Sequence, residues 1–167
     1  MAPSRHATRR AQRDKRKGKS ASTQAGEFVR EEIKKIRKGR HGARSAKQAI
    51  AIGLNEARRA GVDLPPPKKG KASTRTRRSA KYSHDVGQGK RRAKRRPNVS
   101  RAVTRTLKRE GGQAASPRAL SAHARKAASQ RTHAERSASA RKAAASRTHA
   151  ERSASARKAA RTRARNS

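Results

Sequence analysis

The sequence is poor in residues that many folds and chemistries need. Its 167 residues include no cysteine, no tryptophan, one phenylalanine and one tyrosine. The lack of cysteine excludes disulfides, thiol catalysis and cysteine-ligated zinc. The shortage of aromatic side chains argues against modules that bind single strands by stacking. No apolar run approaches the ~20 residues that cross a membrane, and no apolar segment follows the charged N-terminus, so we expect neither membrane binding nor a secretory signal.

Acidic residues are also scarce. Lys and Arg number 49 against 10 Asp and Glu, the formal net charge is +39, and only 30% of the residues are hydrophobic. Such a chain has little apolar area to offset the entropy lost on ordering, so a mostly disordered protein is expected. This composition excludes an ordinary single-domain enzyme, and we expect no cofactor. A charge of this size favours a polyanion as the partner.

Residues 23–64 differ from the rest of the chain in charge and in apolar content. The segment carries ten basic and five acidic residues, which gives +5, whereas the remaining residues carry +34. Within it, Val29, Ile33 and Ile36 recur at helical spacing and predict a helix over about 24–38. We expect Ser22 or Thr23 to cap its start and Gly39 to end it.

A second helix is marked by its caps. Ser45 and Gln48 form a capping box at its start, and Gly61 followed by Val62 predicts a Schellman motif at its end. The two helices predict a small all-α hairpin, and its core or interface residues are Phe28, Val29, Ile33, Ile36, Ile50 and Leu54. Two helices are marginal alone. We therefore expect the hairpin to be weakly stable, to form a homodimer, to dock a protein partner or to become ordered on binding.

The remainder of the chain is predicted as basic, partly helix-competent, low-complexity arms. The expected segments are a basic N-terminal arm (1–22), the hairpin (23–64), a Pro/Gly-punctuated basic linker (65–114) and an Ala/Arg/Ser-rich tail (115–167). A short helix over about 98–110 is possible within the linker. In the tail, the fourteen residues 131–144 recur without change at 147–160, a period of 16. Alanine is the only apolar residue in these copies, which excludes a coiled coil and a solenoid and predicts a tail held open in water by its charges.

The basic runs are the candidate phosphate-binding sites. Neutralising phosphates releases counterions, and arginine can grip a phosphate with two hydrogen bonds. The candidate nucleic-acid-binding residues are Arg9, Arg10, Lys15, Arg16, Lys17, Lys68, Lys69, Arg75, Arg77, Arg78, Lys90, Arg91, Arg92, Lys94, Arg95, Arg96, Arg125, Lys126, Arg136, Arg141, Lys142, Arg152, Arg157 and Lys158. No short set of residues resembles a base-reading surface, so we expect little sequence readout and favour duplex DNA over RNA.

Catalytic and metal sites are not expected. The six histidines are scattered, without the clustered ligands that a metal requires. Glu135 and Glu151 are equivalent members of the repeat, and we do not interpret them as a catalytic pair.

Two stretches carry a resemblance. Gly26–Ile33 (GEFVREEI) followed by His41–Leu54 (HGARSAKQAIAIGL) resembles a family of small, basic, largely uncharacterised bacterial proteins, some of them labelled plasmid stabilisation or DNA-binding proteins. The tail resembles bacterial linker-histone-like proteins in composition. The resemblance implies a histone-like protein of the cytoplasm, associated with the nucleoid or a plasmid. In a eukaryotic cell, Lys90–Arg96 would instead be interpreted as a nuclear import signal. The alternatives are ribosome-associated RNA binding and a hairpin that docks a protein while the tail localises it.

Overall fold

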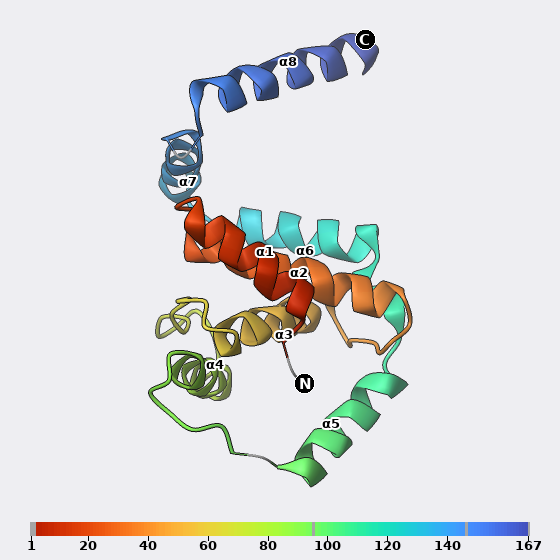
Figure 1. The fold of residues 1–167 in the computed structure, drawn as a ribbon. Coiled ribbons are helices and arrows are strands. Elements are labelled where there is room, and N and C mark those ends of the chain that lie inside the picture. Colours follow the sequence, from red (N-terminus) through yellow and green to blue (C-terminus); the bar gives the residue numbers. More distant parts are fainter. Residues whose placement is uncertain (1–2, 95, 146, 167) are drawn as a thin grey trace. The chain divides into compact units, whose positions relative to one another are not determined.

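The computed structural model describes residues 3–94, 96–145 and 147–166. Over these residues the chain forms eight α-helices, one short 3-10 helix and no strand, and helices cover 73% of them (Figure 1). The prediction of a mostly disordered chain is therefore wrong. The chain divides into two compact units, Met1–His123 and Ala124–Ser167, and each is described by itself.

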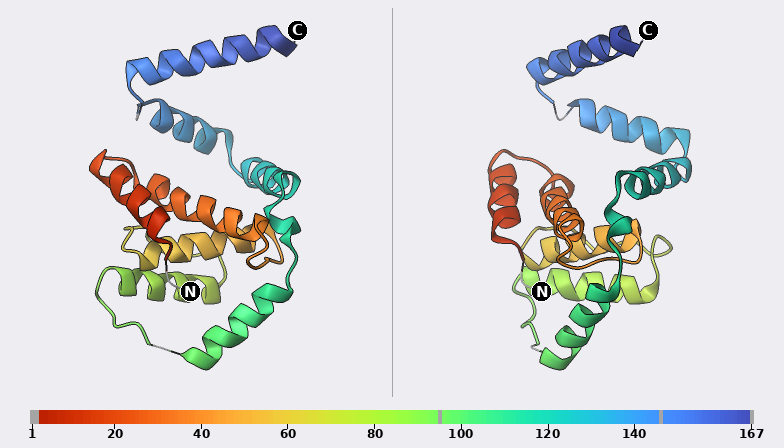
Figure 2. Two further views of the ribbon diagram at one scale, coloured as in Figure 1. Left: turned by 45° about the vertical axis from the view of Figure 1, so that its right-hand side comes forward. Right: turned by 90° about the vertical axis from the view of Figure 1, so that its right-hand side faces the viewer.

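The first unit is a stack of short helices. Its elements are α1 (Arg5–Arg16), α2 (Ala21–Arg37), α3 (Ala46–Arg59), α4 (Thr74–Gly87), α5 (Pro97–Arg109), the 3-10 helix η1 (Gly112–Ala115) and the first part of α6 (Pro117–Ser129). The predicted hairpin is present as α2 and α3, which make the most extensive contact (Figure 2). It is not alone, because α1 packs on α2 and α4 packs on α3.

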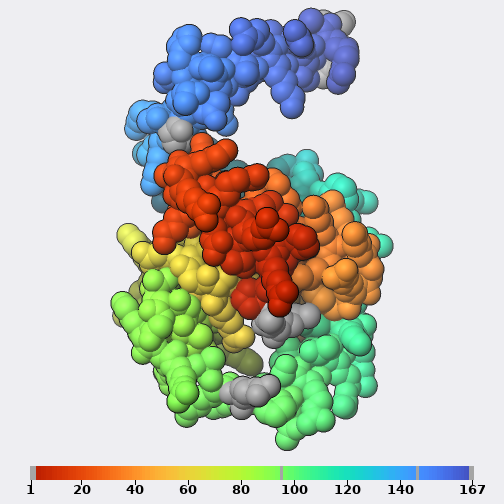
Figure 3. Space-filling view, viewed as in Figure 1, coloured from red at the N-terminus to blue at the C-terminus, as the bar shows by residue number. Residues whose placement is uncertain are grey.

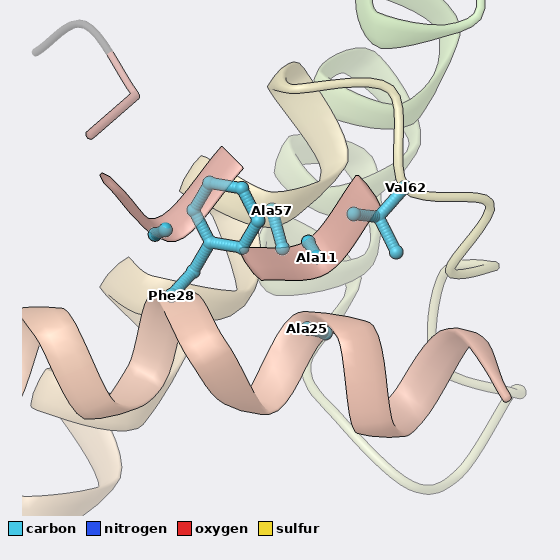
Figure 4. Close-up of a cluster of buried hydrophobic side chains, with 6 residues drawn as sticks. Ala11, Ala25, Phe28, Ala57 and Val62 are labelled. Carbon is cyan, nitrogen blue, oxygen red and sulfur yellow. The ribbon is translucent and has the colours of Figure 1, made fainter. Parts of the chain in front are cut away.

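Alanine makes up most of the core of this unit. Phe28 is fully buried where α1, α2 and α3 meet, surrounded by Ala7, Ala11, Ala25, Ala57 and Val62 (Figure 4). Alanine has a short side chain, so helices that meet through it can approach closely. The residues predicted as a basic arm thus supply Ala7 and Ala11 to the core. Counting bulky apolar residues underestimates such a core, and this is the reason that disorder was wrongly predicted.

A glycine sets the approach of α2 and α3. A Cβ built at Gly53 would lie 2.7 Å from the Cα of Val29. The interior of a close-packed protein leaves no room for such an atom unless the helices move apart. Of the other predicted hairpin residues, Ile36 is buried, whereas Val29, Ile33, Ile50 and Leu54 are half-buried.

The helix ends follow the predicted caps with two differences. Ser20, not Ser22 or Thr23, caps α2 by accepting a hydrogen bond from the N–H of Thr23 (3.4 Å). Gln48 donates its backbone N–H to Oγ of Ser45 (3.2 Å), but its side-chain oxygen accepts from the N–H of Arg44 (2.9 Å).

A glycine with positive φ follows each of the two hairpin helices, as predicted. Gly39 has φ +67° and Gly61 has φ +87°. The N–H of Val62 donates to the carbonyl of Ala57 (3.1 Å), which completes the Schellman motif.

The helix α4 has no counterpart in the sequence-based prediction. It buries only Ala80 and Ser83, so it lacks the apolar periodicity that would reveal it. The side chain of Arg77 donates a hydrogen bond to the carbonyl of Pro67 (3.3 Å), which ties the proline run before α4 to this helix.

The helix α5 matches the short helix considered for 98–110. Leu107 is buried, whereas Val99 and Val103 are 55% and 52% exposed. Beyond it, η1 places Ala114 and Ala115 against Ile36 in a second apolar cluster.

The second unit contains two helices that begin at the same position of the repeat. These are α7 (His133–Ala145) and α8 (His149–Asn166). Thr132 and Glu135 form a reciprocal capping box, in which each backbone N–H donates to the other side chain (3.0 and 3.1 Å). Thr148 and Glu151 repeat it (2.9 and 3.2 Å). The prediction that the charges hold the tail open, without regular structure, is therefore wrong. Each copy of the repeat carries the capping box that begins a helix.

No helix in the part of the chain that the structure describes has both the length and the apolar character of a membrane span.

Candidate nucleic-acid interface

Four acidic residues of the first unit form ion pairs within its helix stack. Arg10 of α1 pairs with Glu27 and, at 3.1 Å, with Glu31 of α2. Burial alone would raise the pKa of Glu31, but the hydrogen bond and charge of Arg10 outweigh it and lower this pKa. Although the sequence pattern predicted Arg10 as a phosphate ligand, the structure places it in an ion pair between two helices.

A second set of charges is buried between α2 and α3. Nζ of Lys35 lies 3.3 Å from Oε2 of Glu32 and 3.0 Å from Oε1 of Glu56. Nε2 of His41 lies 3.4 Å from the other oxygen of Glu32. Burial raises the pKa of Glu32, although the positive charge of Lys35 opposes the shift. Glu32 and Lys35 are at helical spacing, so their pairing can be predicted from sequence, but the contact of Lys35 with Glu56, 21 residues further along the chain, cannot.

The remaining candidate cations of α1 lie on the surface. Arg9, Lys15, Arg16 and Lys17 are exposed, and α1 forms part of the molecular surface (red in Figure 3). Because Glu27 and Glu31 of α2 are paired with Arg10, they leave these cations available to an external anion.

The predicted linker cations are distributed over a loop and a helix. Lys68 and Lys69 are exposed after the proline run, as are Arg75 and Arg78 on α4, whereas Arg77 is half-buried. The run after α4 is exposed at Lys90, Arg91, Arg92, Lys94 and Arg96, and Arg95 lies outside the described residues.

A groove of about 760 Å³ lies between α4 and α5. The two helices stand on opposite sides of a hollow in Figure 3, α4 in yellow-green and α5 in blue-green. Cations line it together with Tyr82, the single tyrosine of the chain. Tyr82 was not among the candidate residues predicted from sequence, and its place among basic runs is the only signal that points to it.

The tail cations lie on three helices and are all exposed. They are Arg125 and Lys126 on α6, Arg136, Arg141 and Lys142 on α7, and Arg152, Arg157 and Lys158 on α8. Residues 5 and 6 positions apart on a helix face different directions, so these cations surround each helix. The Thr-x-x-Glu pattern, not recognised as a cap from sequence, fixes where each of the last two helices begins.

Within the described residues, no group of three or more His, Asp or Glu side chains could hold a metal ion. Nε2 of His84 lies 2.9 Å from Oδ1 of Asp63, and its Nδ1 lies 3.9 Å from Oδ1 of Asp85.

The similarity to known proteins is confined to the first unit. The model of a family of unknown function (DUF6496) matches residues 11–69. The matched stretch runs from the middle of α1 through α2 and α3 to the lysines that follow the proline run. No curated protein and no solved structure matches the chain. The match includes Glu32, Lys35, His41 and Glu56 of the second charge cluster and begins one residue after Arg10, and it leaves α4 to α8 outside.

Proposed function

We propose that this protein binds duplex nucleic acid through the phosphate backbone, DNA in preference to RNA, with little sequence preference. In the cell it acts as a histone-like protein associated with the nucleoid or with a plasmid. Its tail resembles linker-histone-like bacterial proteins in composition, which is consistent with this role.

The separation of the two charge signs carries the proposal. Glu27, Glu31, Glu32 and Glu56 pair with Arg10 and Lys35 inside the helix stack. The candidate cations other than Arg10, Arg77 and the undescribed Arg95 are exposed. A surface with this excess of positive charge attracts a polyanion and releases its counterions on contact.

The helical tail is better suited to contacts with the phosphate backbone than to contacts with base edges. Both repeat helices present arginine and lysine in several directions, and their only apolar side chain is alanine. Arginine binds phosphate with a planar fork, whereas reading a base edge needs a defined face that enters a groove. These helices therefore suit the phosphates on either side of a groove better than the bases within it.

The experiment is a salt titration of duplex DNA binding with the full chain and a charge-neutralised helix. In the variant Arg136→Gln, Arg141→Gln and Lys142→Gln, α7 loses three cations. The slope of log affinity against log salt should become shallower by about 3, since each phosphate contact contributes about 0.9.

A matched control introduces glutamine without removing charge. Ala138→Gln, Ala140→Gln and Ala144→Gln change the same helix, and the slope should stay at the wild-type value. If both variants alter the slope equally, the cations of α7 do not bind phosphate. Competition with structured RNA at the same salt distinguishes the two nucleic acids, and stronger binding of RNA would replace DNA in the proposal.

A further inference from the structure

The groove between α4 and α5 differs chemically from the rest of the basic surface. Its lining includes the cationic side chains of Arg59, Arg91 and Lys94 and the apolar surfaces of Tyr82, Val99 and Val103. A surface that binds only phosphate needs cations and gains nothing from an aromatic ring. The mixture indicates a ligand that is anionic at one part and planar and apolar at another.

Two contacts fix Tyr82 at this place. Its hydroxyl oxygen accepts a hydrogen bond from the backbone N–H of Lys94 (3.1 Å). The guanidinium carbon of Arg91 lies 5.0 Å from the centre of its ring. The ring is therefore tied to the basic run that follows α4, and it holds a planar cation beside it. Aromatic rings and arginine planes are the groups on which proteins stack unpaired bases.

Two valines form the opposite wall. Val99 and Val103 are large apolar side chains that are exposed, at 55% and 52%. They are one helical turn apart on α5, and both line the groove. Their apolar surface matches the edge or face of a base, not a phosphate.

We propose that this groove binds an unpaired nucleotide of a single-stranded nucleic acid. The base lies against Tyr82 and Arg91 with the valines beside it, and the adjoining phosphates contact Arg59 and Lys94. A volume of about 760 Å³ is within the range of small-ligand sites and accommodates a nucleotide with its neighbouring phosphates. The occupant is chosen on charge complementarity, since an apolar peptide would leave the cations of the groove unpaired.

The chain provides its own probe for this site. Tyr82 is the only tyrosine and there is no tryptophan, so intrinsic fluorescence of the full-length protein reports on the groove. We would titrate the protein with an oligothymidylate of about eight nucleotides, a length within the range of known single-strand sites. The matched probe is an abasic oligonucleotide with the same number of phosphates. The oligothymidylate should quench Tyr82 and the abasic strand should leave it unchanged.

Two substitutions separate stacking from support of the fold. Both remove the only tyrosine, so their binding is followed by the fluorescence anisotropy of an end-labelled strand. Tyr82→Leu removes the ring and should weaken oligothymidylate binding by about 5- to 150-fold, the range measured for stacked bases. The affinity for the abasic strand should be unchanged. The slope of log affinity against log salt should also be unchanged, because no charge is lost. Tyr82→Phe keeps the ring, removes only the hydroxyl that holds Lys94, and should bind oligothymidylate within a few-fold of wild type. Thermal unfolding of each variant shows that the helices are intact.

Three results would overturn the proposal. They are equal quenching by the two probes, an equal loss of both affinities in Tyr82→Leu, and a loss in Tyr82→Phe as large as that in Tyr82→Leu. The proposal does not rest on duplex binding. A protein that fails the duplex titration but shows base-dependent quenching would retain this site and lose the proposed function.

Discussion

Nζ of Lys35 lies 3.0 Å from Oε1 of Glu56 and joins α2 to α3 through a buried ion pair. The same ammonium lies 3.3 Å from Oε2 of Glu32, whose side chain is 0% exposed. One ammonium group thus contacts two buried carboxylates, and it lies at the edge of the buried region, where its own side chain is 15% exposed.

Removing this lysine should strongly destabilise the first unit. Lys35→Met leaves Glu32 and Glu56 without their ammonium partner, and loss of one member of a buried pair typically costs about 3–5 kcal/mol. Denaturant unfolding followed by circular dichroism measures this free energy. The exposed neighbour is the control: Lys34→Met should change the free energy by about 0.5 kcal/mol or less. Equal effects of the two substitutions would show that the buried cluster has no special role.

The pH dependence of stability should differ in sign between two adjacent glutamates. Burial raises the pKa of Glu32, so the folded state holds this proton more tightly than the unfolded state does. Above the ordinary Glu pKa of 4.5 the unfolded state releases the proton first, and Glu32 lowers the free energy of unfolding as pH rises. Glu32→Gln should therefore gain stability relative to wild type as pH rises through this window.

Glu31 provides the opposite case. Its pKa is lowered because Arg10 outweighs the effect of burial, so its stabilising contribution is present above pH 4.5 and is lost as pH falls. Glu31→Gln should lose stability relative to wild type as pH rises. Unfolding curves of both variants between about pH 3 and 8 test the pair. If the differences in unfolding free energy between each variant and wild type change in the same direction with pH, the assigned environments of Glu31 and Glu32 are contradicted.

Two glycines within helices should respond in opposite ways to alanine. Gly53→Ala places a Cβ 2.7 Å from the backbone of Val29, so it should destabilise the fold by about 1–3 kcal/mol. A Cβ at Gly26 meets nothing within 4 Å, so Gly26→Ala should stabilise α2 by about 0.5–1 kcal/mol. Thermal unfolding of both variants measures the two shifts. Stabilisation by Gly53→Ala would show that α2 and α3 do not approach as described.

The sequence was sufficient to predict helices where bulky apolar residues recur with caps. Ile33 and Ile36 locate α2, Ser45 and Gly61 bound α3, and Leu107 lies on α5. The sequence did not predict packing through alanine, because Ala7 and Ala11 have too little apolar area to stand out from a basic helix. The charge clusters could not be predicted either, since Lys35 and Glu56 meet only after α2 and α3 have paired.

The repeat illustrates a signal that was present but not used. Glu135 and Glu151 were interpreted only as equivalent members of the repeat, yet each stands three residues after a threonine. That spacing is a capping box, and it predicts a helix start in each copy. The overall charge misled the prediction because it describes the average of the tail and not the local hydrogen bonds that begin a helix.

Loss of a repeat cap should act locally. Thr132→Ala removes the side chain that accepts from the N–H of Glu135 (3.1 Å), so the start of α7 should lose about 1 kcal/mol of protection. Amide hydrogen exchange of the full chain measures this change. Thr162→Ala, in the interior of α8, is the control and should leave exchange in α7 unaltered. Unchanged protection in Thr132→Ala would mean that the capping box does not hold the helix.

The most direct test of the account is the affinity of the wild-type chain for duplex DNA across a salt series. If the exposed cations bind the phosphate backbone, log affinity should fall linearly with log salt, with a slope steeper than about −5. Unrelated duplex sequences of equal length should give the same line. A nearly flat dependence, or strong preference for one sequence at high salt, would contradict the central claim.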